Sequence, residues 1–265
     1  MRIVYISGSH PRHCYIARKL AETGLLVGIV MEKREPMILE VDPKLSDEMK
    51  KMFIHHFELR AKCEEKYFGI DDSMPENVPI LEVEECDING TDVERFIKEI
   101  DANCIFSYGP GILRENILNL CPNMAFNLHG GLSPWYKGSA TMFWPFYFLE
   151  PQYVGTTIHK IEKKIDAGNI IHQTVPVLEK GDCMHEVAAK SVFEAGRELG
   201  RVIQRISEGN IEGVAQKKTG KLFLVKDWRP EHLKLIYETY DDAIVDYYLD
   251  GKIGGESKPK LIRLF

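Results

Sequence analysis

The chain has 265 residues and a mass of 30.4 kDa, which suits one large α/β domain or one domain with a small appendage. Its 44% hydrophobic and 28% charged residues give the balance of a globular protein and exclude general disorder. The formal net charge of −6 argues against the large basic surface that a dedicated nucleic-acid-binding protein presents.

The N-terminal residues and the cysteines indicate a cellular compartment. The chain starts with a strand-like pattern, has no basic and apolar leader, and has no apolar run of about 18 residues. Its six cysteines are far apart, and even the nearest two, Cys104 and Cys121, are 17 positions apart, which is not the spacing of a zinc clamp or a dithiol redox motif. We therefore expect a cytoplasmic protein with reduced thiols and no bound metal.

The first 31 residues predict a strand, a helix and a second strand. Residues 2–7 and 25–31 are short apolar runs, and apolar positions recur at helical spacing between residues 11 and 22. This order predicts a parallel sheet with right-handed crossovers. The turn after the first strand has only Gly8 where a dinucleotide-binding loop needs three glycines, so we do not expect NAD or FAD.

The next segment, residues 34–77, is charged and helical in character. Apolar residues between 45 and 67 lie among Lys and Glu, and we expect an inserted helix packed on the edge of the sheet. Strand and helix patterns then alternate through residues 78–83, 93–100, 102–108, 115–120 and 124–128. These patterns predict an α/β fold with a doubly wound, mostly parallel sheet and helices on both faces.

The last hundred residues add two strands, a long helix and a tail. Residues 153–160 and 169–177 have β-branched alternation around a polar turn, and residues 184–208 have a long helical pattern. The tail reads as a short strand, a turn and helical pieces. We expect a main domain over residues 1–215 and a short C-terminal appendage over residues 216–265.

Polar side chains gather where the strand at residues 124–128 ends, the position at which open α/β sheets bind ligands. Asn127 and His129 are two positions apart, so in extended backbone they point to the same side and offer an amide and an imidazole. Asp166, 37 residues further on in a turn, is the best candidate to orient that imidazole. Each residue taken alone is more often structural, so the prediction depends on their combination.

Four segments follow one another along the chain: Phe106-Ser-Tyr-Gly-Pro-Gly-Ile112, Phe126-Asn-Leu-His-Gly-Gly-Leu-Ser-Pro134 with Lys137-Gly138, Val154-Gly-Thr-Thr-Ile-His159, and Ile165-Asp-Ala-Gly-Asn-Ile170. In this order and spacing they resemble the folate-dependent formyltransferases, a family that includes glycinamide ribonucleotide transformylase, methionyl-tRNA formyltransferase and the nucleotide-sugar N-formyltransferases. The resemblance covers most of residues 1–210.

The resemblance implies a catalytic trio. The family's Asn, His and Asp match Asn127, His129 and Asp166. We expect Asn127 and His129 to stabilise an oxyanion and shuttle a proton, while Asp166 orients the histidine and assists removal of a proton from the amine. One position differs from the family, because Gly131 stands where a serine is usual, and the hydrogen bond of that serine is therefore in question.

The resemblance also implies the two substrates of an N-formyltransferase. The formyl donor would be 10-formyltetrahydrofolate, held by residues of the turn after residue 107 and of the turn that carries Asp166: Tyr108, Gly109, Pro110, Gly111, Ile112, Leu113 and Ile165. Three further side chains are candidates to contact the acceptor through stacking or through phosphate groups: Tyr136, Lys137 and Trp144.

The tail favours one acceptor class. With ten Lys and Arg against eight Asp and Glu it lacks the strongly basic character expected for tRNA, and the chain is longer than glycinamide ribonucleotide transformylase. We expect a nucleotide-linked amino deoxysugar, a role in carbohydrate biosynthesis, and, by resemblance only, a homodimer with no membrane or nucleic-acid partner. The alternatives are another small amine, methionyl-tRNA, a formyltetrahydrofolate hydrolase, or a binding protein without catalysis.

Overall fold

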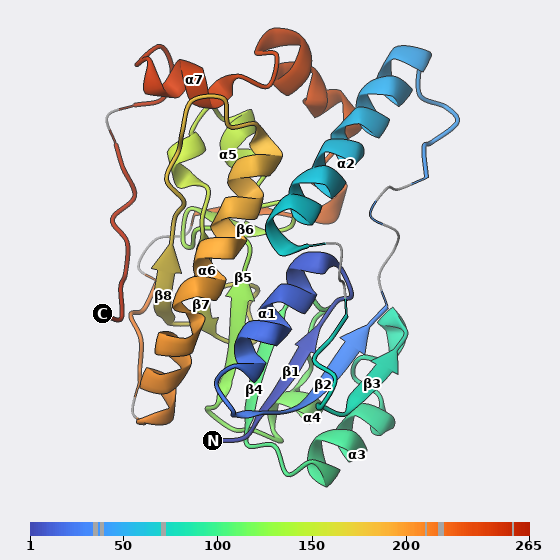
Figure 1. Ribbon diagram of the computed structural model, residues 1–265, viewed down its shortest axis with the longest axis vertical. Helices are drawn as coiled ribbons and strands as arrows, with labels where there is room; N and C mark the ends of the chain where they lie inside the picture. Colours follow the sequence, from blue (N-terminus) through green and yellow to red (C-terminus); the bar gives the residue numbers. More distant parts are fainter. Residues whose placement is uncertain (34–36, 38–39, 70–72, 210, 217–219, 256) are drawn as a thin grey trace.

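The computed structural model describes residues 1–33, 37, 40–69, 73–209, 211–216, 220–255 and 257–265 (Figure 1). Its main sheet has seven strands in the order β3-β2-β1-β4-β5-β7-β8. The first five in this order are parallel, β7 is antiparallel to β5, and β8 is antiparallel to β7. The strands are β1 (Ile3–Ser7), β2 (Leu26–Glu32), β3 (Ile80–Val83), β4 (Cys104–Tyr108), β5 (Ala125–His129), β7 (Thr156–Lys160) and β8 (Ile170–Thr174).

Helices cover both faces of this sheet. Alternate residues of β1 face opposite ways: Ile3 and Tyr5 pack with side chains of α1 and α6, whereas Val4 and Ile6 pack with side chains of α3 and α4. The predicted doubly wound, mostly parallel sheet is therefore confirmed. The helices of the described residues are α1 (Pro11–Ala21), α2 (Asp47–Phe68), α3 (Thr91–Glu99), α4 (Glu115–Leu118), α5 (Trp144–Tyr147), α6 (Met184–Ser207) and α7 (Ile244–Leu249).

The inserted helix α2 exists as predicted, but its expected place at the sheet edge is wrong. It begins after Ser46, whose side chain accepts a hydrogen bond from the backbone N–H of Met49 at 3.2 Å. Its main contacts are with α1 and α6, and the two edges of the sheet are formed by β3 and β8. The reason is that Cys63 and Phe68 are buried in the same hydrophobic cluster as residues of α1 and α6.

The C-terminal residues pack closely on the rest of the chain. Strand β9 (Lys221–Phe223) pairs in parallel with β6 (Tyr136–Gly138) in a separate two-stranded sheet. Further on, the backbone N–H of Gln173 in β8 donates to the carbonyl of Ile262 at 2.9 Å. Backbone pairing and hydrogen bonds thus cross the predicted boundary at residue 215.

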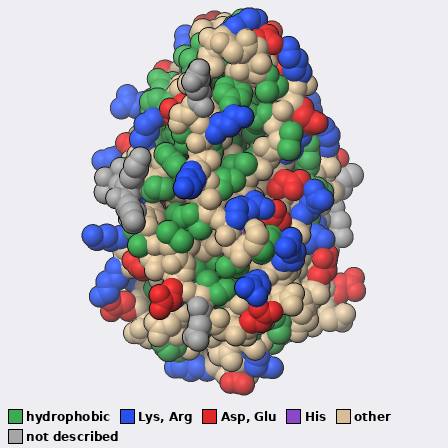
Figure 2. Space-filling view, turned by 90° about the vertical axis from the view of Figure 1, so that its left-hand side faces the viewer, with side chains coloured by type: hydrophobic (Ala, Val, Ile, Leu, Met, Phe, Trp, Pro, Cys, Tyr) green, Lys and Arg blue, Asp and Glu red, His purple; other side chains and the backbone are tan. Residues whose placement is uncertain are grey.

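The surface carries small apolar groups. Figure 2 shows one face of the molecule on which hydrophobic side chains form several separate groups, with Lys, Arg, Asp and Glu side chains between them. Among the residues described, no helix combines the length and the hydropathy needed to cross a bilayer.

Candidate active site

The structure brings Asn127, His129 and Asp166 together, and these three residues are called the trio below. Asn127 and His129 lie on β5, and Asp166 lies in the turn of residues 161–169 between β7 and β8. Oδ2 of Asp166 is 3.4 Å from Nδ1 of His129, and Oδ1 of Asp166 is 3.3 Å from Nε2 of His159. One carboxylate therefore lies between two imidazole rings.

Backbone groups fix the Asp166 side chain in this position. The N–H of Gly138 donates to Oδ2 of Asp166 at 2.8 Å. Gly138 has a φ of +89°, and a Cβ there would lie 2.0 Å from the carbonyl oxygen of Phe223, so only glycine fits. Burial raises the pKa of Asp166, but the His129 and His159 rings and the Gly138 N–H outweigh it and bring that pKa to about 2. The carboxylate is thus ionised at neutral pH.

His129 is buried, with 6% of its side chain exposed. Its Nε2 donates to the carbonyl oxygen of Tyr136 at 3.0 Å, because a carbonyl can only accept. Its Nδ1 faces the Asp166 carboxylate, so a proton added at Nδ1 would be donated to that carboxylate. Burial lowers the pKa of His129, and the Asp166 carboxylate opposes that shift only in part.

Asn127 is oriented from two sides. The hydroxyl of Ser107 on β4 donates to Oδ1 of Asn127 at 2.9 Å, and Nδ2 of Asn127 donates to Nε2 of His159 at 3.3 Å. His159 lies directly opposite Asn127 in the antiparallel pairing of β5 with β7. Its Nδ1 donates to the carbonyl of Lys160 at 2.7 Å, which leaves Nε2 as the acceptor. The amide nitrogen of Asn127 thus points into the space shared with Asp166.

Sequence reasoning missed two residues of this site. His159 ends the segment Val154–His159 that resembles the family, and its alternation with Thr157 on a strand is the sequence signal that could mark it. Gln216 donates from Nε2 to the carbonyls of Asp166 and Gly168, both at 2.8 Å, and so holds the turn of residues 161–169. No local pattern marks Gln216, because it lies 50 residues beyond Asp166.

The space around Gly131 explains why a glycine stands at the position of the family serine. A Cβ on Gly131 would lie 2.5 Å from Nε2 of His129 and 2.6 Å from Cβ of Thr141. The hydroxyl of Thr141 donates to the carbonyl of Gly130 at 2.5 Å. Thr141 therefore fills the space that a serine side chain would need.

The residues predicted to hold the folate lie on two neighbouring loops. Tyr108 ends β4 and is buried, and Gly111 donates its N–H to Oε2 of Glu32 at 2.9 Å. Ile112 and Ile165 are exposed to solvent, with 72% and 44% of their surface accessible. Leu113 is buried and Gly109 is exposed. Pro110 and Gly111 are half-buried.

An ion pair joins the turn that carries Asp166 to the helix that follows the loop of residues 108–113. Nζ of Lys163, in the turn of residues 161–169, lies 2.5 Å from Oε1 of Glu115, at the start of α4.

Two of the three residues predicted to contact the acceptor are packed in the protein core, and this geometry does not support stacking on a ligand. The Trp144 ring stacks on the Phe223 ring with centroids 4.4 Å apart, and the Tyr136 ring is also stacked with Phe223, at a centroid distance of 6.2 Å. Tyr136 and Trp144 are 1% and 3% exposed. Lys137, between them in sequence and on β6, is half-buried.

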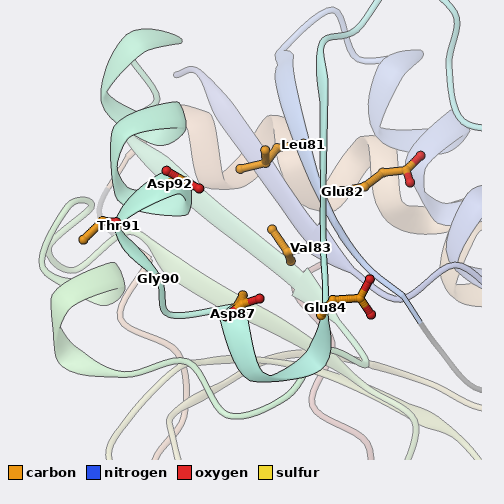
Figure 3. Close-up of a pocket in the computed structure, with 8 residues that line it drawn as sticks. All are labelled: Leu81, Glu82, Val83, Glu84, Asp87, Gly90, Thr91 and Asp92. Carbon is orange, nitrogen blue, oxygen red and sulfur yellow. The ribbon is translucent and has the colours of Figure 1, made fainter.

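A hollow beside the edge strand β3 is separate from the trio. It lies beside β3 and α3, and carboxylates dominate its lining (Figure 3). Strands β2, β1 and β4 lie between β3 and β5 in the sheet, so this hollow does not open on His129. Its lining residues are Leu81, Glu82, Val83, Glu84, Asp87, Gly90, Thr91 and Asp92.

Comparisons with known proteins show what this chain is similar to. Residues 87–203 match the family described as formyl transferase. The chain is similar to the structure of the formyltransferase PseJ from Anoxybacillus kamchatkensis, solved with UDP-4,6-dideoxy-4-formamido-L-AltNAc and tetrahydrofolate, at 19% identity and a TM-score of 0.50 over 95% of this chain and 98% of that one.

Two further structures resemble the chain. One is a sugar N-formyltransferase from Shewanella, with 15% identity and a TM-score of 0.53 over 89% of this chain and 87% of that one. The other is a phosphoribosylglycinamide formyltransferase from Anaplasma phagocytophilum, with 16% identity and a TM-score of 0.56 over 84% of this chain and 97% of that one. The predicted resemblance and the formyltransferase-like fold are confirmed.

Proposed function

We propose that this chain, a folate-dependent formyltransferase by its domain at residues 87–203, transfers the formyl group of 10-formyltetrahydrofolate to the primary amine of a nucleotide-linked amino deoxysugar. The observation that carries the site assignment is the Asp166 carboxylate between His129 and His159, with the Asn127 amide beside them. Hydrogen-bond donors, an ionised carboxylate and a titratable ring are what formyl transfer requires.

The trio matches the charges that develop in the reaction. The acceptor nitrogen forms a bond to the formyl carbon, the carbonyl oxygen gains negative charge, and the bond from that carbon to the folate nitrogen then breaks. Nδ2 of Asn127 and the Nε2 proton of His129 are the donors available for the oxyanion. The acceptor amine loses a proton and the leaving nitrogen gains one, so a proton must move across the site.

Asp166 is suited to manage that proton. With a pKa of about 2 it is a weak base by itself, and its charge acts mainly to stabilise an imidazolium at His129 and to hold the ring. A water held by the carboxylate, or His129 itself, would receive the proton of the amine. The ion pair then keeps the transferred proton within reach of the leaving nitrogen.

One of the two proposed oxyanion donors is occupied by the protein in this structure. Nε2 of His129 donates its one proton to the carbonyl of Tyr136, whereas Nδ2 of Asn127 has two N–H groups and donates one of them to His159. Productive binding therefore requires the formyl oxygen to displace the Tyr136 carbonyl, which needs a local shift of residues 135–138. The side chains of Ile112 and Ile165 are exposed, so both are accessible for the contacts with folate that we propose.

The proposed acceptor draws on the structural relatives. PseJ, whose structure holds a nucleotide-linked formamido sugar, aligns over nearly the whole length of both chains. The phosphoribosylglycinamide formyltransferase from Anaplasma covers a smaller share of this chain, 84%, but has the higher TM-score, 0.56 against 0.50. Phosphoribosylglycinamide is therefore the second candidate acceptor.

A coupled assay tests the proposal. The protein is mixed with 10-formyltetrahydrofolate and tetrahydrofolate release is followed with a panel of nucleotide-linked amino sugars, with phosphoribosylglycinamide, and without an amine. Turnover with one amino sugar, lost in His129→Ala, supports the proposal. Turnover only with phosphoribosylglycinamide overturns the acceptor, and formate release without an amine indicates a hydrolase.

A further inference from the structure

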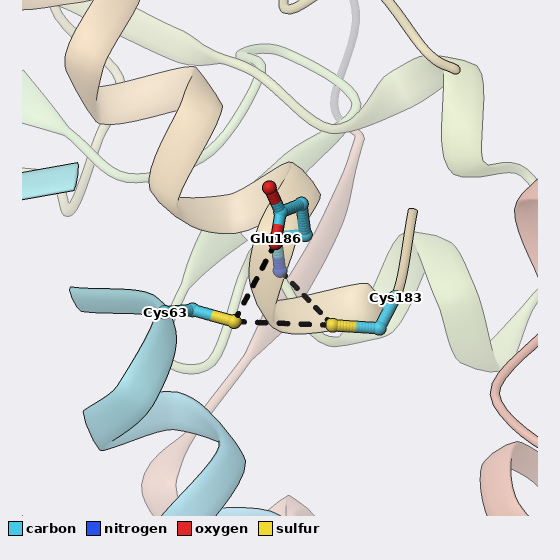
Figure 4. Close-up of side chains that lie close together, drawn as sticks. All are labelled: Cys63, Cys183 and Glu186. Carbon is cyan, nitrogen blue, oxygen red and sulfur yellow. Dashed lines mark hydrogen bonds between the residues drawn. The ribbon is translucent and has the colours of Figure 1, made fainter. Parts of the chain in front are cut away.

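Two cysteines that lie 120 positions apart in the sequence meet where α2 passes the first turn of α6 (Figure 4). Sγ of Cys63, on α2, is 3.9 Å from Sγ of Cys183, the residue that caps α6. Sγ of Cys63 is also 3.9 Å from Oε2 of Glu186. The ligand atoms of these three residues all lie within 4.8 Å of one another.

These separations match those of a tetrahedral zinc site. Zinc–sulfur bonds of about 2.3 Å at tetrahedral angles place two thiolate sulfurs about 3.8 Å apart. The observed 3.9 Å is close to that value, whereas a disulfide would require the sulfurs to approach to about 2.05 Å. A disulfide would also give no role to the carboxylate.

The Glu186 carboxylate is already oriented as a ligand. Its Oε1 accepts from Nζ of Lys66 and from the hydroxyl of Tyr67, both at 2.6 Å. Oε2 is left facing Cys63, and a ligating carboxylate held by outer hydrogen bonds in this way is typical of metal sites. The positive charge of Lys66 also reduces the repulsion between this carboxylate and two thiolates.

A backbone donor supports a thiolate at Cys183. The N–H of Glu186 donates to Sγ of Cys183 at 3.4 Å. Because a metal binds thiolates, binding of a divalent cation would release the protons of both thiols.

We propose that Cys63, Cys183 and Glu186 bind one zinc(II) ion, with water as the fourth ligand. Two thiolates and a carboxylate select zinc over magnesium or calcium, which prefer oxygen ligands. The site lies between α2 and α6, apart from the trio on β5 and its neighbouring turn. Its effect would be to fix the inserted helix α2 on the start of α6.

Metal titration of the full chain tests the proposal. The protein, reduced and stripped of metal, is titrated with zinc against a chromophoric chelator and with cobalt(II), whose thiolate complexes absorb in the near ultraviolet. We expect one metal per chain and a thiolate-to-cobalt band. Cys63→Ser and Cys183→Ser should each lose that affinity by more than about 100-fold, and Tyr67→Phe by about 10-fold through the outer hydrogen bond.

Cys86→Ser is the matched control, because Cys86 is exposed and outside the cluster. Alkylation of wild-type protein provides a readout that needs no variant: zinc should slow the modification of Cys63 and Cys183 but not of Cys86. No cobalt–thiolate band, equal zinc affinity in the wild type and both serine variants, or formation of a Cys63–Cys183 disulfide that explains their protection would each overturn the proposal.

Discussion

Oδ2 of Asp166 lies 3.4 Å from Nδ1 of His129, although the turn that carries Asp166 begins at the opposite end of the paired strands from His129. Strand β7 is antiparallel to β5, so Lys160, at its end, lies opposite Phe126, near the start of β5. The turn of residues 161–169 must therefore fold back along β5 to bring Asp166 to His129. The Gly138 N–H and the Gln216 side chain hold it there.

The low pKa of Asp166 predicts how this residue contributes to stability. A carboxyl whose pKa falls from 3.8 to about 2 on folding stabilises the fold at any pH above 3.8, and this contribution is lost as the pH falls toward 2. Its size is about 2 kcal/mol. Asp166→Asn should lower the free energy of unfolding near pH 6 by that amount, and urea denaturation should show the difference from wild type shrinking between about pH 4 and pH 2. An unchanged difference over this range would contradict the low pKa of Asp166.

Removing either oxyanion donor should reduce turnover. Asn127→Ala and His129→Ala are each expected to lower kcat by about 10²- to 10³-fold, because a donor aimed at the developing charge is worth about 3 to 4 kcal/mol. The measurement is the rate of tetrahydrofolate release at saturating substrates. Asn116→Ala, which removes an amide that bonds Asn89 and Glu94 at the surface, is the control and should keep wild-type kcat.

Introducing the family serine should be harmful in this chain. In Gly131→Ser the new Cβ would lie 2.5 Å from Nε2 of His129 and 2.6 Å from Cβ of Thr141, so at least one of these side chains must move. We expect a loss of about 1 to 3 kcal/mol in stability, together with a lower kcat. Gly200→Ser is the control, because a Cβ at Gly200 meets nothing within 4 Å. A Gly131→Ser protein as stable and active as the wild type would show that the Thr141 packing adapts freely.

Asp242 should make the protein less stable as the pH rises. Burial raises its pKa from 3.8 to about 6, although the Met184 N–H opposes this, and its Oδ2 has no partner in the described residues. Because the folded state disfavours the charged form, stability falls as the pH rises from 3.8 to about 6 and stays lower above it. Wild type should therefore gain about 1.5 kcal/mol relative to Asp242→Asn on going from about pH 8 to pH 5, measured by thermal or urea unfolding. A constant difference between the two proteins would argue against this.

The Gln216 side chain should matter for catalysis without touching the substrate. Gln216→Ala removes two hydrogen bonds to the carbonyls of Asp166 and Gly168, worth about 1 kcal/mol each. We expect kcat to fall by about 10-fold and the pH profile of kcat to shift, since the position of Asp166 beside His129 is loosened. Gln204→Ala, at an exposed position of α6, is the control. A change in stability with an unaltered pH profile would mean that Gln216 is only structural.

The sequence alone predicted the fold class and the candidate trio, the first from local patterns and the second from segments that resemble a known family. Strand and helix periodicities with Gly and Pro between them predict a doubly wound sheet, and the spacing of Asn127 and His129 on one strand puts both side chains on the same side. The match of residues 87–203 to the formyl transferase family confirms the resemblance read from these segments.

Only the tertiary structure decided which distant groups meet. Strand pairing puts His159 opposite Asn127, the returning tail brings Gln216 to the Asp166 turn, and helix packing puts Cys63 against Cys183. It also buried Tyr136 and Trp144 against Phe223, and placed α2 on α1 and α6 instead of on the sheet edge. The physical reason is that burial and close packing depend on contacts between residues far apart in the chain, which periodicity along a single segment does not encode.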